Sequence, residues 1–491
     1  MLGKMVRIPT GQRRGENFKL LKLGLLHLRN QDMRSFCAAL PKALRNPPCS
    51  RSSIKGMPFP AFHLPKAMKL SSFSLVASSL LSLVAAAPVT LLKRDNRWDY
   101  KNDKIYGVNI GGWLVLEPYI TPSLFEAVSS DVPVDEYHYT EALGKEEAER
   151  RLQEHWSTWI REEDFKGMAD VGLNFVRLPI GYWAFQLAEG DPYVQGQQEY
   201  LDKALEWCAK YGLKAWVDLH GAPGSQNGFD NSGKRGEIGW QNTTGYVDLT
   251  IQVLDQIASK YGGSNYSDVI IGIELLNEPL GSNLDFDELV DFYNKGYQLV
   301  RDNGNAPVII HDAYLPDHTF DNVLNTEQDP NVWEVIVDHH HYQVFDVGSL
   351  SQSIDEHVST ACGWGQSENT EYHYTLCGEW TAALTDCAKW LNGAGRGARY
   401  DATFGGGNYI GSCDQLYTAN YDYFTPEVIS NYRRYVEAQM DSFLYGKNAG
   451  WVFWCWKTEN TIEWDMQRLI GLGIIPQPFD DRQYPNQCGF D

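Results

Sequence analysis

Short apolar runs alternate with longer segments of helical periodicity from about residue 104 onward. Each run is five to eight residues long and is bounded by polar or turn-forming residues, a pattern typical of buried strands. The predicted strands are Ile105–Ile110, Asn174–Pro179, Lys214–Leu219, Val269–Leu276, Pro307–His311, Val335–His340, Tyr374–Trp380 and Gly450–Trp456.

Between these runs, apolar residues recur at the three- and four-residue spacing of amphipathic helices. The predicted helices are Glu162–Val171, Glu199–Tyr211, Tyr246–Tyr261, Asp285–Asp302 and Pro426–Tyr445. Strands separated by helices favour parallel βαβ units, and no glycine-rich phosphate motif follows the first strand. The pattern predicts an α/β fold: a single (β/α)₈ TIM barrel over residues 95–491, with elaborated loops at its C-terminal face.

Polar and aromatic residues gather where the predicted strands end. Catalytic groups of such barrels come from the C-terminal ends of the strands. Six of the eight runs end in this way, at Arg177–Pro179, His220–Ala222, Asn277–Pro279, His340–Tyr342, Glu379–Trp380 and Trp454–Trp456. We therefore expect one polar site at this mouth of the barrel.

The N-terminal part differs from the rest in charge. Residues 1–94 hold sixteen Lys and Arg against two Asp and Glu, which leaves 26 basic and 61 acidic residues for 95–491. So acidic a body repels phosphate backbones and anionic lipids, so nucleic acid and membrane surfaces are not expected as partners. A neutral polymer suits it better.

Residues 68–87 have the pattern of a secretory signal: Met68 and Lys69 precede an apolar run that ends in three alanines. The alternative is a membrane anchor, but the run is short and rich in serine. Residues 88–94 form an expected pro-segment that ends in the dibasic Lys93-Arg94. Residues 1–67 are expected to be a mis-annotated or disordered leader, with a genuine extension as the alternative.

The cysteines also indicate secretion. Seven of the nine lie in the body, none in CxxC spacing, so a zinc-finger type of site is not expected. Some should pair in an oxidising compartment, whereas Cys208, Cys377 and Cys455 sit in apolar runs and are expected to be buried thiols. Asn242 and Asn265 begin glycosylation sequons.

Two glutamates stand at matched strand ends, Glu278 after Asn277 and Glu379 before Trp380. Either alone could be a solvated loop charge. Together they suit glycoside cleavage, which needs a carboxylic acid at the leaving oxygen and a carboxylate on the other side of the sugar. Arg177 is placed to keep one of them ionised.

The chain resembles glycoside hydrolase family 5, and within it the fungal exo-β-1,3-glucanases. The resemblance covers about residues 98–491 and rests on an ordered set of motifs: Gly107–Pro118, Val176–Pro179, Asp218–Gly228, Leu276–Pro279, His340–Tyr342, Gly378–Trp380 and Gly450–Glu459. It implies a retaining exo-β-1,3-glucanase that releases glucose from non-reducing ends by double displacement, with some transglycosylation. In this mechanism Glu278 is the acid/base and Glu379 the nucleophile.

The resemblance also implies the surroundings of these glutamates. The supporting residues are Arg177, His220, Asn277, His340 and Tyr342. The sugar-binding residues are Glu117, Phe229, Asp230, Asn231, Phe345 and Trp454, where Trp454 and Trp456 share one predicted strand face and compete as the platform beneath the sugar. The implied disulfides are Cys362–Cys488 and Cys387–Cys413.

No metal or cofactor is expected. His339, His340 and His341 could suggest a metal site, but adjacent strand residues point to opposite faces, so the three cannot converge on one ion. The expected partner of this secreted or cell-wall monomer is β-1,3-glucan or its oligosaccharides, with no membrane contact after processing. The rival functions are another family 5 glycanase (endo-cellulase, mannanase or transglycosylase), a catalytically silent glucan-binding wall protein, and a coenzyme-dependent barrel enzyme.

Overall fold

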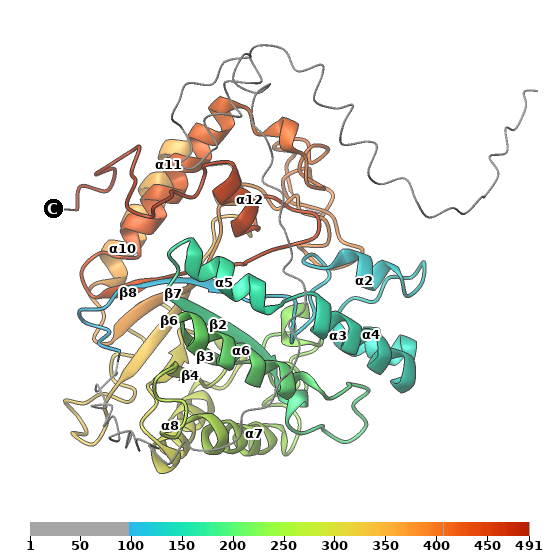
Figure 1. Cartoon of the computed structure of the whole chain (residues 1–491), viewed down its shortest axis with the longest axis vertical. Helices are drawn as coiled ribbons and strands as arrows, with labels where there is room; N and C mark the ends of the chain where they lie inside the picture. Colours follow the sequence, from blue (N-terminus) through green and yellow to red (C-terminus); the bar gives the residue numbers. More distant parts are fainter. Residues whose placement is uncertain (1–97, 406, 491) are drawn as a thin grey trace, which may run out of the picture. The chain divides into compact units, whose positions relative to one another are not determined.

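The structure is a computed structural model that describes residues 98–405 and 407–490. Eight parallel strands, hydrogen-bonded in chain order, close into a barrel (Figure 1). They are β1 (Ile105–Asn109), β2 (Phe175–Gly181), β3 (Lys214–Gly221), β4 (Ile270–Glu274), β5 (Val308–His311), β6 (Val335–His341), β7 (Tyr374–Trp380) and β8 (Asn448–Phe453). The predicted TIM barrel is confirmed, while the predictions for residues 1–67, 68–87 and 88–94 lie outside the described residues.

Helices alternate with most of the strands. The five predicted helices appear as α5 (Glu162–Asp170), α6 (Gln197–Tyr211), α7 (Tyr246–Tyr261), α8 (Phe286–Asn303) and α11 (Pro426–Ser442). Four further helices were not predicted. Three lie between β1 and β2 and one between β6 and β7: α2 (Pro122–Glu126), α3 (Glu136–Leu143), α4 (Lys145–Thr158) and α10 (Ile354–Glu368). The short α9 (Val347–Leu350) follows β6, and α12 (Met466–Gly471) follows β8. Between β5 and β6, residues 312–334 form turns instead of a helix.

Local signals fix the helix ends. Helix α8 begins where the Asp285 side chain accepts a hydrogen bond from the Glu288 backbone N–H at 3.0 Å. Helix α11 begins with Pro426 at its first turn, where a missing N–H costs nothing. Helix α6 ends at Gly212, whose φ of 76° lies in the left-handed region that glycine tolerates.

The lower half of the barrel, at the N-terminal ends of the strands, is an apolar layer. Its side chains are at most 2% exposed: Ile105, Phe175, Trp216, Ile271, Ile309, Ile336, Leu376, Ala449 and Val452. Tyr100 packs onto this layer, and its hydroxyl accepts from Trp216 Nε1 at 2.8 Å and donates to the Ile271 carbonyl. The layer excludes water from the base of the barrel and supports the polar layer above it.

An irregularity between β6 and β7 decides which residue of β7 faces the interior. His339 pairs with Cys377, but His340 pairs with Glu379, so Gly378 is an extra residue in β7. Strict alternation from the inward-facing Leu376 would direct Trp380 inward and Glu379 outward. The extra residue reverses this order. It must be glycine, because a side chain there would collide with the Asp338 carboxylate.

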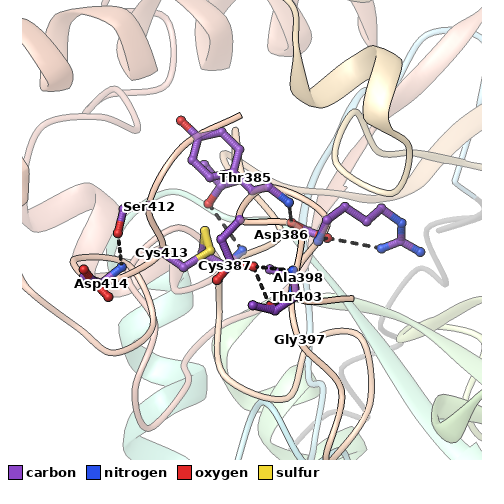
Figure 2. The surroundings of a disulfide bond; sticks show 12 residues. Thr385, Asp386, Cys387, Gly397, Ala398, Thr403, Ser412, Cys413 and Asp414 are labelled. Carbon is purple, nitrogen blue, oxygen red and sulfur yellow. Dashed lines mark hydrogen bonds and ion pairs between the residues drawn. A yellow bond between two sulfur atoms is a disulfide. The ribbon is translucent and has the colours of Figure 1, made fainter. Parts of the chain in front are cut away.

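Both disulfides implied by the resemblance are present in the structure. Cys362–Cys488 joins α10 to the C-terminal segment, and Cys387–Cys413 closes a loop after β7. Figure 2 shows this second bond with Asp386 beside it, whose carboxylate accepts from the backbone N–H groups of Arg399 (2.7 Å) and Tyr400 (3.0 Å). The long β7–α11 connection is therefore fixed by a disulfide and by the hydrogen bonds of Asp386.

Candidate active site

Strand ends bring Glu278 and Glu379 together at the C-terminal mouth, each 3% exposed. Glu278 follows β4 in a left-handed conformation (φ 46°), and Glu379 lies within β7. His340 Nδ1 lies 2.7 Å from Glu278 Oε1 and 3.4 Å from Glu379 Oε2. These two oxygens are therefore at most about 6 Å apart, which suits the roughly 5–5.5 Å spacing of retaining glycosidases.

Two donors hold the Glu379 carboxylate. Arg177 Nη1 donates to Oε1 at 2.9 Å, and the Tyr342 hydroxyl donates to Oε2 at 2.8 Å. Both contacts favour the ionised form of the carboxylate. The structure therefore places both Arg177 and Tyr342 against the Glu379 carboxylate.

Glu278 has different partners. Besides His340 at Oε1, Asn231 Nδ2 donates to Oε2 at 2.7 Å. Asn227 Nδ2 donates to the Glu278 backbone carbonyl at 3.1 Å and so fixes the turn that carries the side chain. Within the described residues, no lysine or arginine forms an ion pair with Glu278, in contrast to Glu379.

A buried network around Arg177 supports the site, and the sequence analysis missed most of it. Arg177 Nε donates to Glu274 Oε2 at 2.8 Å, and Nη1 lies 3.1 Å from Asp218 Oδ2. Nη1 also donates to Asn109 Oδ1 at 3.2 Å, and Nη2 to Asn277 Oδ1 at 2.7 Å. Asp218 could have been found from the period of two, since it lies two residues before His220 on β3.

The same network leaves two groups free to meet a ligand. His220 Nδ1 lies 2.7 Å from Asp218 Oδ2, while Nε2, although buried, makes no hydrogen bond within the protein. Burial lowers the pKa of His220 to about 3, so the neutral ring carries its proton on Nδ1 and Nε2 is an acceptor. Asn277 Nδ2 is likewise a buried donor without a partner. A sugar with several hydroxyls would satisfy both.

The two carboxyls titrate as a coupled pair because both contact His340. Burial lowers the pKa of His340, but Glu379 and Asp338 outweigh it and raise this pKa well above its ordinary value. Burial raises the pKa of Glu379 to about 7, opposed by His340 and assisted by the charge of Glu278. For Glu278, burial is outweighed by the hydrogen bond and charge of His340, and the pKa is lowered. The charge state of His340 therefore governs where a shared proton resides.

Glu117 belongs to the same pocket. Its side chain is 6% exposed, and burial together with the charges of Asp230, Glu379 and Glu278 raises its pKa well above the ordinary value. Its loop is fixed by the buried Glu136, which accepts from the Leu116 N–H at 2.9 Å. Asn231 reaches the site through Glu278, and burial raises the pKa of Asp230 to about 7.

The two candidate tryptophans lie in different places. Strand β8 ends at Phe453, so Trp454 and Trp456 do not share a strand face, and that prediction was wrong. Trp454 stacks on His220 at 5.6 Å between ring centroids, beside the catalytic groups. Trp456 donates to Asp164 Oδ1 of α5 at 3.0 Å, away from the pocket. Trp454 is therefore the ring that borders the site.

The other two predicted aromatics lie at the rim. Phe229 and Phe345 are each 41% exposed, which is unusual for phenylalanine. Phe345 packs against Tyr342 with ring centroids 5.4 Å apart, so it extends the aromatic wall from Glu379 outward. Tyr314, which the sequence analysis missed, is 44% exposed and its hydroxyl contacts Glu278.

The structure also locates the two sequons, the free cysteines and the three adjacent histidines. Asn242 and Asn265 are exposed, so both sequons are accessible, and Cys208, Cys377 and Cys455 are buried free thiols. The three adjacent histidines diverge as expected: His340 faces Glu278, whereas His339 contacts Asp312, and His341 packs on Trp364. In the part of the chain that the structure describes, no helix is both long and apolar enough to cross a membrane.

Comparison with known proteins now identifies the family. The sequence model of cellulase (glycosyl hydrolase family 5) matches residues 140–460. A glucan 1,3-beta-glucosidase of Pichia angusta is 95% identical over 434 residues, covering 88% of this chain and 100% of that protein. Glucan 1,3-beta-glucosidase 2 of Wickerhamomyces anomalus is 56% identical over 436 residues, covering 86% of this chain and 100% of that protein.

Solved structures agree on the fold. The rutinosidase from Aspergillus niger superposes with a TM-score of 0.61 at 19% identity, covering 77% of this chain and 99% of that one. At that identity the likeness concerns the barrel alone. The family model and the two yeast relatives together show that the chain belongs to glycosyl hydrolase family 5.

Proposed function

We propose that this glycoside hydrolase is a retaining exo-β-1,3-glucanase that releases glucose from the non-reducing ends of β-1,3-glucan. The observation that carries the proposal is the pair of buried glutamates, Glu278 and Glu379, bridged by one imidazole nitrogen. The substrate class is supported by the relatives, which are named as glucan 1,3-beta-glucosidases. Secretion is supported by the two disulfides, and we propose a monomer acting in the cell wall.

In the first step the Glu379 carboxylate attacks the anomeric carbon, and the bond to the leaving oxygen breaks. Glu278 gives its proton to that oxygen, so the remaining glucan leaves as a neutral alcohol. In the second step Glu278 takes a proton from water, the hydroxide displaces Glu379, and glucose leaves with its β configuration retained. A sugar hydroxyl in place of water would give transglycosylation.

Neighbouring residues assist these steps. Arg177 and Tyr342 stabilise Glu379 whenever it is ionised, before attack and as the leaving group. Asn277 Nδ2, which has no partner in the protein, is free to donate to the sugar 2-hydroxyl, a contact that strengthens in the transition state. Trp454, Phe229 and Phe345 offer apolar ring faces to successive glucose units.

The mechanism requires that the proton resides on Glu278 when the substrate reacts. A charged His340 favours the opposite arrangement, because it lowers the pKa of Glu278 while Glu379 is raised to about 7. Arg177, however, pairs with Glu379 alone of the two. We propose that a bound sugar excludes water and that His340 then transfers its Nδ1 proton to Glu278 Oε1, which leaves His340 neutral and Glu278 protonated.

We propose that loop residues close one end of the pocket and so restrict the enzyme to exo attack. Glu117, Asp230 and Asn231 come from the loops after β1 and β3 and carry acceptors or donors suited to the hydroxyls of a terminal glucose. A closed end leaves room for one sugar unit beyond the cleaved bond, whereas endo-acting enzymes need an open groove. Product analysis tests this directly.

Replacing either glutamate by alanine should abolish hydrolysis with the fold preserved. We expect kcat to fall by about 10³-fold or more for Glu278→Ala and Glu379→Ala, whereas the exposed Glu149→Ala on α4 should match the wild type. With an aryl glucoside whose leaving group needs no acid, Glu278→Ala should recover its first step and Glu379→Ala should not. Near-wild-type hydrolysis in both alanine variants would refute the mechanism.

The substrate is tested on laminarin-type glucan with time-resolved product analysis. We expect glucose as the first and only early product, appearing as the β anomer. Mixed oligosaccharides from carboxymethyl-cellulose would instead assign the chain to an endo-acting specificity. Release of glucose as the α anomer would exclude a retaining mechanism.

A further inference from the structure

The outward side of β6 carries a second cluster of buried ionisable groups, separate from the catalytic one. His339 points away from the barrel interior that His340 faces. Its Nε2 lies 2.8 Å from Glu368 Oε2, at the end of α10, and 3.3 Å from Glu371 Oε2, in the turn before β7. The three residues are 4%, 2% and 4% exposed, and one ligand atom of each lies within 4.8 Å of the others.

Negative charge exceeds positive charge in this cluster. Asp312 adds a third carboxylate, with Oδ2 2.8 Å from His339 Nδ1. The nearby Lys447 ammonium donates to the backbone carbonyl of Glu371, and its single charge cannot offset three carboxylates. His339 therefore faces three carboxylates in a site that water barely reaches, and one of them, Asp312, also lies 3.1 Å from His311 Nδ1.

One oxygen of the cluster is left without a hydrogen bond. Glu368 Oε2 is fully buried and accepts none within the protein, since its short approach to His339 Nε2 lacks hydrogen-bond geometry. A buried carboxylate oxygen whose close partner is a misaligned imidazole is costly and requires an explanation. Two ligand atoms at 2.8 and 3.3 Å from an imidazole nitrogen have the mutual spacing expected around a cation with bonds of about 2.0–2.2 Å.

Neighbouring hydrogen bonds orient His339 and Glu371, as the residues behind metal ligands usually do. Asp312 accepts from His339 Nδ1–H, which directs the Nε2 lone pair toward Glu368 and Glu371 once Nε2 is deprotonated. The His318 backbone N–H donates to Glu371 Oε1 at 3.1 Å and leaves Oε2 turned toward the imidazole. A carboxylate behind a histidine is a regular feature of metal ligation.

We propose that His339, Glu368 and Glu371 form a site for one divalent cation of the zinc class. One imidazole nitrogen and two carboxylate oxygens suit Zn²⁺, whereas Ca²⁺ and Mg²⁺ prefer oxygen ligands alone. The cation neutralises the excess charge and joins β6 to the α10–β7 connection, directly behind His340. The site is structural, because its ligands face away from the catalytic pocket.

A second group with metal-ligand spacing, Glu278, His311 and His340, belongs to the catalytic pocket and provides the control. The enzyme is produced with zinc in the medium and dialysed extensively, and its zinc content and thermal midpoint are measured before and after treatment with a chelator. We expect one zinc per chain and a lower midpoint after chelation. Re-addition of Zn²⁺, but not of Ca²⁺ or Mg²⁺, restores the midpoint.

Variants locate the ion. Glu368→Gln keeps the shape of the side chain and should weaken zinc binding by at least about 100-fold, the upper end of the loss that outer-shell changes cause. Glu278→Gln should retain full zinc content. If Glu368→Gln does not fold, Asp312→Asn provides the same test, with an expected loss of about 10–100-fold.

The proposal is overturned if wild-type protein holds no more zinc than Glu368→Gln or Asp312→Asn. It is also overturned if Glu278→Gln is the variant that loses the ion, because the cation then sits in the catalytic pocket. Restoration of the midpoint by Ca²⁺ as well as by Zn²⁺ would exclude ligation by His339. None of these outcomes depends on the proposed glucanase activity.

Discussion

The lower and upper halves of the barrel interior are built from the same eight strands but differ in almost every physical respect. On β2, Phe175 belongs to the apolar layer, and two residues later Arg177 carries a buried charge. On β6, Ile336 is followed at the same spacing by Asp338 and then His340. On each of these strands, inward-facing residues only two positions apart therefore belong to the apolar layer and to the buried ionic network.

The two halves also differ in how completely their groups are satisfied. In the lower layer the polar atoms pair locally, as Trp216 does with the Tyr100 hydroxyl. In the upper layer His220 Nε2, Asn277 Nδ2 and His340 Nε2 are buried without a hydrogen bond. Buried polar groups without hydrogen bonds reduce the stability of the fold. The lower half therefore stabilises the fold, whereas the upper half presents groups that a polar ligand can satisfy. Substitutions should separate these two properties.

The largest expected effect is that of Arg177→Met in the upper half. The substitution keeps much of the volume but leaves Glu274, Asp218 and Glu379 without their cation. Removing one partner of a buried ion pair costs about 3–5 kcal/mol, and the nucleophile loses a donor as well. We expect the free energy of unfolding to fall by that amount and kcat/KM to fall by roughly 10³-fold, as measured by denaturant titration and glucan hydrolysis.

The control is Arg150→Met, which removes an exposed arginine on α4 with a side chain 59% accessible. Surface ion pairs contribute about 0–1 kcal/mol, so this variant should be close to the wild type. If Arg177→Met were as stable as Arg150→Met, the upper layer would not be organised around the arginine charge, and the contrast between the halves would have to be abandoned.

The sequence was sufficient for the architecture, and it singled out two glutamates that the structure brings together at the barrel mouth. Short continuous apolar runs located all eight strands, since strands of a parallel barrel are buried on both faces. Helix α4 was missed because its sequence is mostly charged, with only Ala148, Leu152, His155 and Trp156 buried. The four buried residues recur at helical spacing within the β1–β2 connection, so the local pattern for this helix was present in the sequence.

The site was less predictable where strands are irregular. Glu379 faces the interior only because Gly378 is an extra residue in β7, and no local pattern indicates that register shift. Trp454 and Trp456 were placed on one face because β8 was predicted to continue to Trp456, whereas it ends at Phe453. Long-range pairing, not propensity, decides both positions.

The second effect concerns the lower half alone. Ile336→Ala removes a 1% exposed side chain from the apolar layer, four residues before His340 on the same strand. The cavity should reduce the free energy of unfolding by about 2–5 kcal/mol. Measured well below the thermal midpoint, kcat should stay within about twofold of the wild type, since no polar group of the network moves with it.

A large fall in kcat for folded Ile336→Ala would show that the apolar layer controls the geometry of the catalytic groups and would weaken the proposed division. Ile336→Val is the graded companion, with an expected loss of about 0.5–1.5 kcal/mol. The two variants should lie on one line of stability against deleted volume, with activity unchanged along it.

The smallest effect is a shift of a pH profile. Tyr342→Phe removes the hydroxyl that donates to Glu379 Oε2 at 2.8 Å but keeps the ring against Phe345 and Trp464. Loss of a donor to the carboxylate disfavours its ionised form, so the pKa of Glu379 rises further. A hydrogen bond to a charged group contributes about 1.5–3 kcal/mol, which corresponds to a rise of roughly 1 pH unit or more.

Because the nucleophile must be ionised in the substrate complex, where the proton resides on Glu278, kcat falls on the acidic side as Glu379 gains a proton. The acidic limb of the profile should therefore move to higher pH in Tyr342→Phe, while the alkaline limb, which reports loss of the proton from the acid, stays in place. If the alkaline limb moves instead, the hydroxyl acts on the proton donor, and the roles of Glu278 and Glu379 in the upper layer must be exchanged.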